Sequence, residues 1–123
     1  MRKKSEYLLG ANEAELERLR FQHWVWKKIT DNFFDRVGVQ QRWKCLDVGS
    51  GPGFTSMDLR DRVGTNGEVT ALEPSEFYLN FLREEASAKV WTNINLIQGR
   101  AEEADLPLRH FDFIFVRWVI AFV

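Results

Sequence analysis

Several features that would assign this protein to a particular class are scarce or missing. One cysteine, Cys45, excludes an intramolecular disulfide and is typical of a reducing cytoplasm. No apolar run approaches the roughly 20 residues that a membrane span requires, and Met1 is not followed by an apolar stretch of signal-peptide length. These absences predict a cytoplasmic protein without a membrane span.

An excess of charge of one sign is also missing, because 17 Lys and Arg residues stand against 18 Asp and Glu. Nucleic-acid binding requires clustered cations, so we predict no nucleic-acid partner. There is no internal repeat and no linker rich in Pro, Gly or Ser. The remaining composition, 45% hydrophobic and 28% charged over 123 residues, is that of at most one globular domain.

The first third of the chain has the periodicity of a helix, and we assign residues 1–40 to a helical segment. Asn12 and Glu15 have the spacing of a capping box, which predicts that the helix starts at Asn12, and Gly38 predicts its end. One apolar face is predicted to pack on the core: Leu16, Leu19, Trp26, Ile29, Phe33 and Val37. A second stripe, Phe21, Trp24 and Val25, indicates further cover, either ordinary packing or a lid over a ligand pocket.

From residue 41 the pattern changes to alternating strands and helices. Strands are predicted at 44–48, 68–72, 93–97 and 111–116, and helices at 55–63 and 76–88, the second capped by Ser75. Such alternation predicts an α/β fold with a parallel sheet, in which ligands bind beyond the carboxyl ends of the strands. Cys45, within the first strand, is predicted to be an inert buried thiol.

The loop after the first strand is the most informative segment. Gly49, Gly51 and Gly53 permit a tight turn, positive φ angles and close approach of the backbone to a ligand. Phe54 stands where the dinucleotide fingerprint G-x-G-x-x-G requires its last glycine. Asp47 would repel a pyrophosphate, whereas a ligand with an ammonium or sulfonium group is compatible with it.

Glu73 follows Gly53 by 20 positions, at the end of the second predicted strand. An acid at this spacing is expected to accept hydrogen bonds from both ribose hydroxyls, a task that suits the two oxygens of a carboxylate. The alternative is that Glu73 is a surface acid at a strand end. The presence of the glycine loop in the same βαβ unit disfavours that alternative.

These residues together resemble the class I S-adenosylmethionine-dependent methyltransferases. The loop 47–53 is similar to their first motif, Glu73 to the acid that ends their second strand, 99–107 to their third motif beside the adenine, and 111–119 to their fourth strand and following turn. The resemblance covers Trp43 to Val123. More loosely, Tyr7-Leu8-Leu9-Gly10 with Glu15, Arg18, Leu19 and Gln22 is similar to the leading helix of ubiquinone-biosynthesis-like methyltransferases.

The resemblance implies a Rossmann-like three-layer sandwich, S-adenosyl-L-methionine as cofactor, and methyl transfer to a small-molecule substrate. The cofactor-binding residues it implies are Asp47, Gly49, Ser50, Gly51, Gly53, Glu73, Pro74, Ala101, Glu102 and Arg117. Arg100 stands where the family often has Asp, so Glu102 is the candidate acceptor for the adenine amino group. Backbone contacts to the methionine moiety are implied at Arg117, whose side chain could instead pair with a surface acid.

No catalytic residue and no metal site is predicted. Because a sulfonium makes its methyl group electrophilic, the protein mainly positions the reactants and excludes water, and a general base is needed only if the nucleophile must lose a proton. By residue type His23 and His110 are the candidates. His23 could overhang the pocket from the leading helix, whereas His110 lies at the opposite end of the sheet.

Two alternatives remain open: a nicotinamide-dependent oxidoreductase, which shares the βαβ unit, and a module that holds the cofactor without turnover. The family fold resembles a seven-stranded sheet of order 3-2-1-4-5-7-6, of which this sequence supplies strands 1–4. We therefore expect 41–123 to be the incomplete, cofactor-binding half of a methyltransferase domain, inactive by itself. The apolar run from Phe111 to Val123 would form an exposed edge strand, at which two copies could associate.

Overall fold

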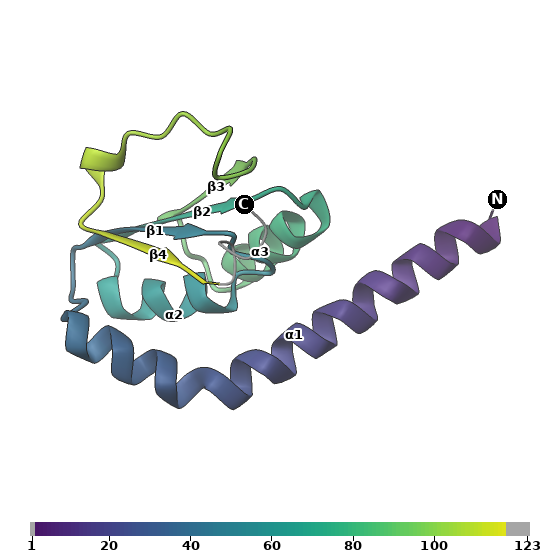
Figure 1. The fold of residues 1–123 in the computed structure, drawn as a ribbon, viewed down its shortest axis with the longest axis horizontal. Coiled ribbons are helices and arrows are strands. Elements are labelled where there is room, and N and C mark those ends of the chain that lie inside the picture. The colour runs from purple at the N-terminus through teal and green to yellow at the C-terminus, as the bar shows by residue number, and fades with distance from the viewer. Residues whose placement is uncertain (1, 118–123) are drawn as a thin grey trace.

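The chain forms a four-stranded parallel sheet with a long leading helix (Figure 1). The computed structural model describes Arg2 to Arg117. Its elements are α1 (Arg2–Val37), β1 (Lys44–Val48), α2 (Phe54–Val63), β2 (Glu68–Glu73), α3 (Glu76–Ala88), β3 (Ile94–Gln98), the short 3-10 helix Leu108–His110 and β4 (Phe113–Val116). The predicted alternation is confirmed, and Ser75 caps α3 by accepting a hydrogen bond from the Tyr78 N–H at 3.3 Å.

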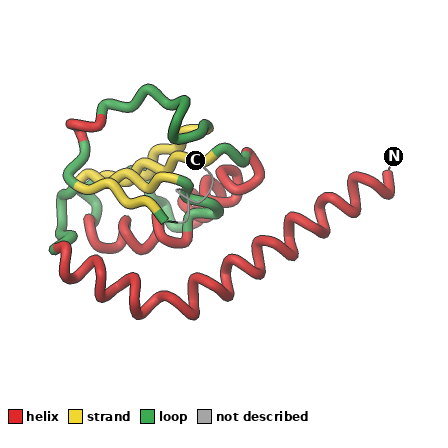
Figure 2. Tube along the Cα trace, in the orientation of Figure 1, coloured by secondary structure: helices red, strands yellow, loops and turns green. Residues whose placement is uncertain are grey.

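The strands lie in the order β3-β2-β1-β4, and every neighbouring pair is parallel. The three helices lie on one face of the sheet, and the connection 99–112 crosses the other (Figures 1 and 2). This arrangement confirms the predicted α/β, Rossmann-like fold. It also brings the carboxyl ends of β1, β2 and β4 together at one edge, where the loops of the candidate site lie.

Alternate residues of the strands build an apolar core on each face. On the helix side the buried residues are Phe34, Val39, Cys45, Leu59, Val63, Val69 and Phe115. On the other side Leu46, Val48 and Leu72 are covered mainly by Leu106, Phe111 and other residues near 99–112. The prediction that Cys45 is buried is confirmed, and burial raises the pKa of its thiol to about 12, which disfavours the reactive thiolate.

The predicted start of the leading helix is wrong, and its predicted end is confirmed. α1 continues through Asn12, whose neighbours are mainly Ala and Glu, strong helix formers. Glu15 does not act as a cap but accepts a hydrogen bond from Arg18 Nε at 3.0 Å. The helix ends at Gly38, which has a φ of 85° and donates to the Phe34 carbonyl at 2.9 Å.

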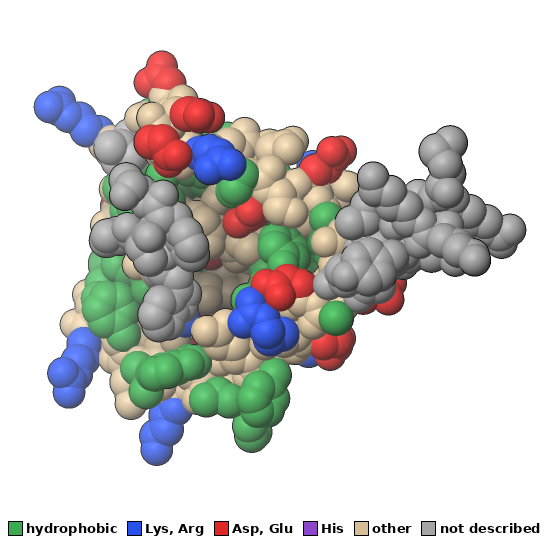
Figure 3. All heavy atoms as spheres, turned by 45° about the vertical axis from the view of Figure 1, so that its right-hand side comes forward, with side chains coloured by type: hydrophobic (Ala, Val, Ile, Leu, Met, Phe, Trp, Pro, Cys, Tyr) green, Lys and Arg blue, Asp and Glu red, His purple; other side chains and the backbone are tan. Residues whose placement is uncertain are grey.

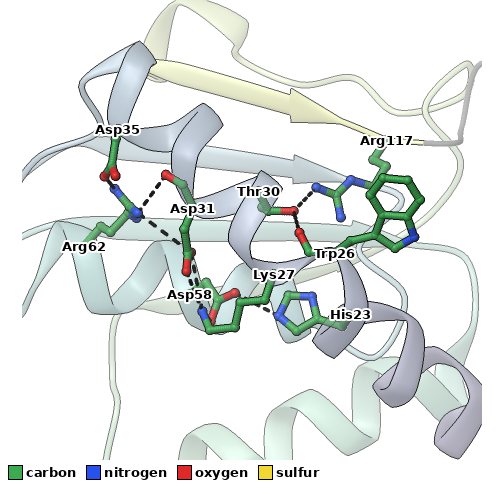
Figure 4. Close-up of polar contacts among 9 residues, drawn as sticks. All are labelled: His23, Trp26, Lys27, Thr30, Asp31, Asp35, Asp58, Arg62 and Arg117. Atoms are coloured by element: carbon green, nitrogen blue, oxygen red, sulfur yellow. Dashed lines mark hydrogen bonds and ion pairs between the residues drawn. The ribbon is translucent and has the colours of Figure 1, made fainter.

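The predicted core face of α1 is confirmed at Leu16 and wrong for most of its other residues, since the helix is rotated. Its buried residues are Leu16, Thr30 and Phe34, whereas Ile29 is 59% exposed. Polar contacts fix this rotation: Lys27 pairs with Asp58 of α2 at 3.3 Å, and α1 and α2 are further joined through Arg62 (Figure 4). The ionic pairs thus select a face that apolar periodicity does not reveal.

The other predicted apolar residues of α1 are exposed in whole or in part. Trp26, Phe33 and Val37 are exposed, as is the second stripe formed by Phe21, Trp24 and Val25. Hydrophobic side chains accordingly line the lower side of the surface in Figure 3, where α1 runs. Within residues 2–117, no helix is both long and apolar enough to cross a membrane.

β4 is shorter than predicted, and the predicted tail beyond it lies outside the described residues. Asp112 exchanges two hydrogen bonds with the Lys44 backbone, at 2.7 and 2.8 Å, and thereby anchors the entry of the strand. In the described part of the chain β4 pairs with β1 alone, and Ile114 and Val116 are exposed.

Candidate functional site

The glycine loop between β1 and α2 has the positive φ angles that its sequence predicts. Gly49, Gly51 and Gly53 have φ angles of 69°, 56° and 89°, in the left-handed region that favours glycine. The N–H groups of Gly49 and Ser50 donate to the Leu72 carbonyl at 2.8 and 3.1 Å. The loop is therefore fastened to the end of β2.

Two of these glycines have different surroundings. A Cβ at Gly53 would lie 2.6 Å from the side-chain methyl groups of Leu82, so this glycine lets α3 pack closely against the loop. A Cβ at Gly51 would meet nothing within 4 Å. Gly51 therefore faces open space, where a ligand can approach the backbone.

Glu73 joins the glycine loop to the turn that follows β2. Its side chain is largely buried, with 8% of the residue exposed. Oε1 accepts a hydrogen bond from the Gly51 N–H and Oε2 one from the Ser75 N–H, both at 2.8 Å. Since each carboxylate oxygen can accept more than one hydrogen bond, Glu73 retains acceptor capacity at the carboxyl edge of the sheet.

Asp47 is a carboxyl group enclosed beneath the loop, with 3% of the residue exposed. Burial raises its pKa to about 6, even though Ser56 Oγ donates to Oδ2 at 2.6 Å and the positive charge of Arg117 opposes the rise. A cationic ligand beside Asp47 would offset the cost of burying its negative charge. The site is therefore matched to a positively charged group.

A cavity of about 120 Å³ lies between α1 and the glycine loop. Its lining is Leu19, Gln22, His23, Trp26, Asp47, Gly49, Ser50, Gly51, Pro52, Phe54, Thr55, Phe115 and Arg117. Typical ligand pockets hold roughly 300–1,000 Å³, so the enclosed part fits one end of a cofactor rather than the whole.

Five of the ten predicted cofactor residues line this cavity: Asp47, Gly49, Ser50, Gly51 and Arg117. Glu73 lies next to it through its bond to Gly51. Pro74 is exposed beyond β2, and Ala101 and Glu102 are exposed in the connection 99–112. The adenine contacts predicted for these three residues stay predictions.

The sequence predicted only some of the α1 residues that line the cavity. Leu19, Gln22, His23 and Trp26 line the cavity, whereas the stripe predicted as a lid does not. Leu19 and Gln22 belong to the looser resemblance of the leading helix, and that was the available signal. His23 overhangs the cavity, as the sequence allowed.

Arg117 ties the end of β4 to α1 (Figure 4). Its Nη2 donates to the hydroxyl of buried Thr30, which itself donates to the Trp26 carbonyl at 3.1 Å. The guanidinium lies 5.1 Å from the centre of the Phe115 ring, and burial lowers its pKa below the usual value. Among the side chains described for residues 12–117, Arg117 pairs with no surface acid, which was the alternative considered for it.

The donor set fits an S-adenosylmethionine-type ligand better than a metal ion. The buried acid Asp47, the open backbone at Gly51 and the acceptor Glu73 suit a cation, a close backbone contact and a pair of hydroxyls, respectively. In the described part of the chain, no three His, Cys, Asp or Glu residues form a group that could hold a metal ion.

Comparisons with known proteins agree with this geometry. A profile of a methyltransferase domain family matches residues 40–123. Over 95 residues the chain is 33% identical to a demethylmenaquinone methyltransferase of Staphylococcus aureus and 30% identical to the ubiquinone/menaquinone biosynthesis C-methyltransferase UbiE of Shewanella sediminis. These alignments cover 77% and 76% of this chain and 37% of each relative, so the chain spans little more than a third of their length.

The fold comparison gives the same result. A solved SAM-dependent methyltransferase from Aquifex aeolicus superposes with a TM-score of 0.63 at 28% identity, covering 70% of this chain and 46% of the other. These matches favour S-adenosyl-L-methionine over a nicotinamide cofactor. By sheet order and family match, the chain belongs to the class I S-adenosylmethionine-dependent methyltransferases, whose cofactor is S-adenosyl-L-methionine.

Proposed function

We propose that this chain holds S-adenosyl-L-methionine with its amino-acid end in the cavity beneath α1 and its ribose at Glu73, for methyl transfer to a small-molecule acceptor. The observation that carries the proposal is the link between Glu73 and Gly51, which unites the ribose acid and the glycine loop at one edge of the sheet. Asp47 and Arg117 complete the cavity beside that link.

The charges of the cavity suit the two ends of an amino acid. Asp47 supplies a buried negative group for the ammonium or sulfonium, and Arg117 supplies guanidinium donors for the carboxylate. No ion pair joins Asp47 to Arg117 among the described residues, so the two charges are held apart. A zwitterion between them would compensate both.

The remaining assignments follow the direction of the strands. Both oxygens of Glu73 face backbone donors and have capacity for two ribose hydroxyls. The adenine would then lie over Pro74 towards Ala101 and Glu102, whose carboxylate is the candidate acceptor for its amino group. Gly53 contributes by keeping α3 close to the loop.

The bound cofactor supplies an electrophilic methyl group whose transfer releases a neutral thioether. The chain's own contribution is to fix the cofactor through Asp47, Arg117 and Glu73 and to exclude water with α1. The two curated relatives are named for demethylmenaquinone and for ubiquinone/menaquinone biosynthesis, which supports a small-molecule acceptor.

Isothermal titration of the chain with S-adenosylhomocysteine, S-adenosylmethionine and NAD tests the proposal. We expect both adenosyl ligands to bind with one site per chain and NAD to give no heat of binding. Equal binding of NAD, or no binding of the adenosyl ligands, would contradict it. Binding without transfer of a labelled methyl group to a small phenol or hydroquinone would favour the alternative of a module without turnover.

A further inference from the structure

His23 is the one histidine in the lining of the cavity, and its position is fixed from two sides. Its Nε2 lies 2.8 Å from Oδ2 of Asp58 on α2 (Figure 4). Its ring stacks on that of Phe54, the first residue of α2, with centroids 5.7 Å apart and planes at 30°. The side chains of His23 and Asp58 are each only 16% exposed, so the pair is shielded from bulk water.

The contact with Asp58 determines which ring nitrogen can take up a proton. Burial alone would raise the pKa of Asp58, but its hydrogen bond to His23 and the charges of His23 and Lys27 hold the pKa below the usual value. The carboxylate is therefore ionised and can only accept, so Nε2 of His23 carries the proton in this contact. In the neutral ring Nδ1 is then the acceptor, and it has no hydrogen-bond partner among the side chains that the structure describes from residue 12 onward.

Charged groups from every neighbouring element surround this pair. Four of these groups are positive and four are negative, which keeps the local charge close to balance. They are Arg20 and Lys27 on α1, Asp58 and Asp61 on α2, Glu85 and Lys89 on α3, Asp47 at the end of β1, and Arg117 after β4. Asp58 also pairs with Lys27, whose Nζ lies 3.3 Å from Oδ1. The negative charge of Asp58 is therefore balanced partly by Lys27, while its other oxygen orients the His23 ring.

We propose that His23 is a catalytic residue, the general base that removes a proton from the acceptor, and that Asp58 is its positioning residue. This inference rests on the proposed function, because it requires the methyl group to lie in the cavity that His23 lines. The acceptor is then an O–H, N–H or acidic C–H compound rather than an anion that is already deprotonated.

The step balances with the groups at hand. The proton of the acceptor passes to Nδ1 of His23, and the electron pair of the acceptor forms the new bond to the methyl carbon. The bond between that carbon and sulfur breaks with its electron pair on sulfur, leaving a neutral thioether. The imidazolium is stabilised by Asp58 and returns its proton to water.

The second histidine provides an internal control. His110 also pairs with a carboxylate, Glu68, through Nε2 at 2.6 Å, but at the opposite edge of the sheet. We propose an NMR titration of both imidazole rings against pH in the whole 123-residue chain, free and saturated with S-adenosylhomocysteine or S-adenosylmethionine. The two ligands differ by one positive charge on sulfur, at the position of the transferred methyl group.

The proposal predicts that both ligands shift the His23 resonances and that the pKa of His23 is lower with S-adenosylmethionine than with S-adenosylhomocysteine. A unit charge within about 6 Å changes a pKa by roughly half a unit or more. His110 should respond to neither ligand. Ligand binding with the same His23 pKa in both complexes would overturn the role of His23 and leave the cofactor site intact. Failure of both ligands to bind would overturn the cofactor site and the base together.

Asp58→Asn and Glu68→Gln test the positioning role as a matched pair. Asp58→Asn should lower the pKa of His23 and allow its ring to adopt more than one orientation. The pKa shift caused by S-adenosylmethionine should persist. Glu68→Gln should do the same to His110 alone. An unchanged His23 pKa in Asp58→Asn would show that the carboxylate does not control the ring.

Discussion

The two ends of the sheet carry the same kinds of side chain under opposite conditions. Each end has a histidine paired with a carboxylate and an acid that accepts a backbone N–H: His110, Glu68 and Asp112 at the amino end, His23, Asp58 and Glu73 at the carboxyl end. At the amino end the groups are largely in contact with water, and the His110 side chain is 38% exposed. At the carboxyl end Glu73 is buried, the side chains of His23 and Asp58 are each only 16% exposed, and His23 lines a cavity.

The two ends differ in the free energy that an ionised side chain costs the folded protein. Water screens the amino-end pairs, so they contribute little, typically less than about 1 kcal/mol each. Burial at the carboxyl end holds Asp47 and Arg117 in states that cost free energy in the protein alone. That cost is offset only when a group of complementary charge binds. For this reason we give similar residue types a structural role at the amino end and propose a binding site at the carboxyl end.

The largest contrast is expected between the two acids that begin and end β2. Glu73→Ala should weaken binding of S-adenosylhomocysteine by about 2–4 kcal/mol, at roughly 1–2 per hydrogen bond to a charged acceptor. Glu68→Ala should leave the affinity unchanged, because it lies at the amino end. Isothermal titration measures both. A loss of equal size in the two variants would mean that the ends of the sheet do not differ in function.

The next effect concerns stability and its dependence on pH at Asp47. Since its folded pKa is raised from 3.8 to about 6, its contribution to the free energy of unfolding is fully present below pH 4 and is lost as the pH rises to 6. Asp47→Asn should remove this decline and be more stable than the wild type at pH 7 by about 2–3 kcal/mol, while binding the cationic cofactor less tightly.

Urea unfolding of both proteins between pH 4 and 7 measures the difference, with Asp112→Asn as the amino-end control. Asp112→Asn should keep the wild-type dependence on pH. Parallel stability curves for wild type and Asp47→Asn would show that Asp47 ionises in the folded protein without penalty.

The smallest expected effect comes from two glycine substitutions, which distinguish backbone strain from a contact with the ligand. Gly51 and Gly38 both have positive φ and open space where a Cβ would stand. Gly51→Ala and Gly38→Ala should each cost about 1 kcal/mol of stability, the price of a left-handed alanine. Only Gly51→Ala should also weaken cofactor binding, which thermal unfolding with and without S-adenosylhomocysteine detects. Equal ligand stabilisation in the two variants would reduce the loop to a simple turn.

Local signals made most of the sheet and part of the site predictable. The bounds of β1 and α3 agree with the prediction, since a short apolar run and the Ser75 cap each depend on neighbouring residues. The glycine loop and Glu73 were predictable for the same reason, because their spacing lies within one βαβ unit.

The orientation of α1 was not predictable, because it depends on contacts between distant segments. Its apolar residues indicate a different face from the one that Lys27 and Asp58 select, residues that lie 31 positions apart in the sequence. For this reason the lining residues Trp26 and His23 were missed or left undecided, while Phe21 and Trp24 were wrongly expected to receive cover.

The hydrogen bond between Arg117 and Thr30 has a consequence for the order of folding. It joins residues 87 positions apart, whereas each strand of the β1–β2–β3 unit pairs with the next strand along the chain. Contacts between distant segments form late, because closing a long loop costs entropy before the contact compensates for it. We therefore expect the β1–β2–β3 unit, with its glycine loop and Glu73, to form first. The cavity then closes only when α1 and the end of β4 meet, so the chain assembles the proposed ribose site before the cavity proposed for methyl transfer.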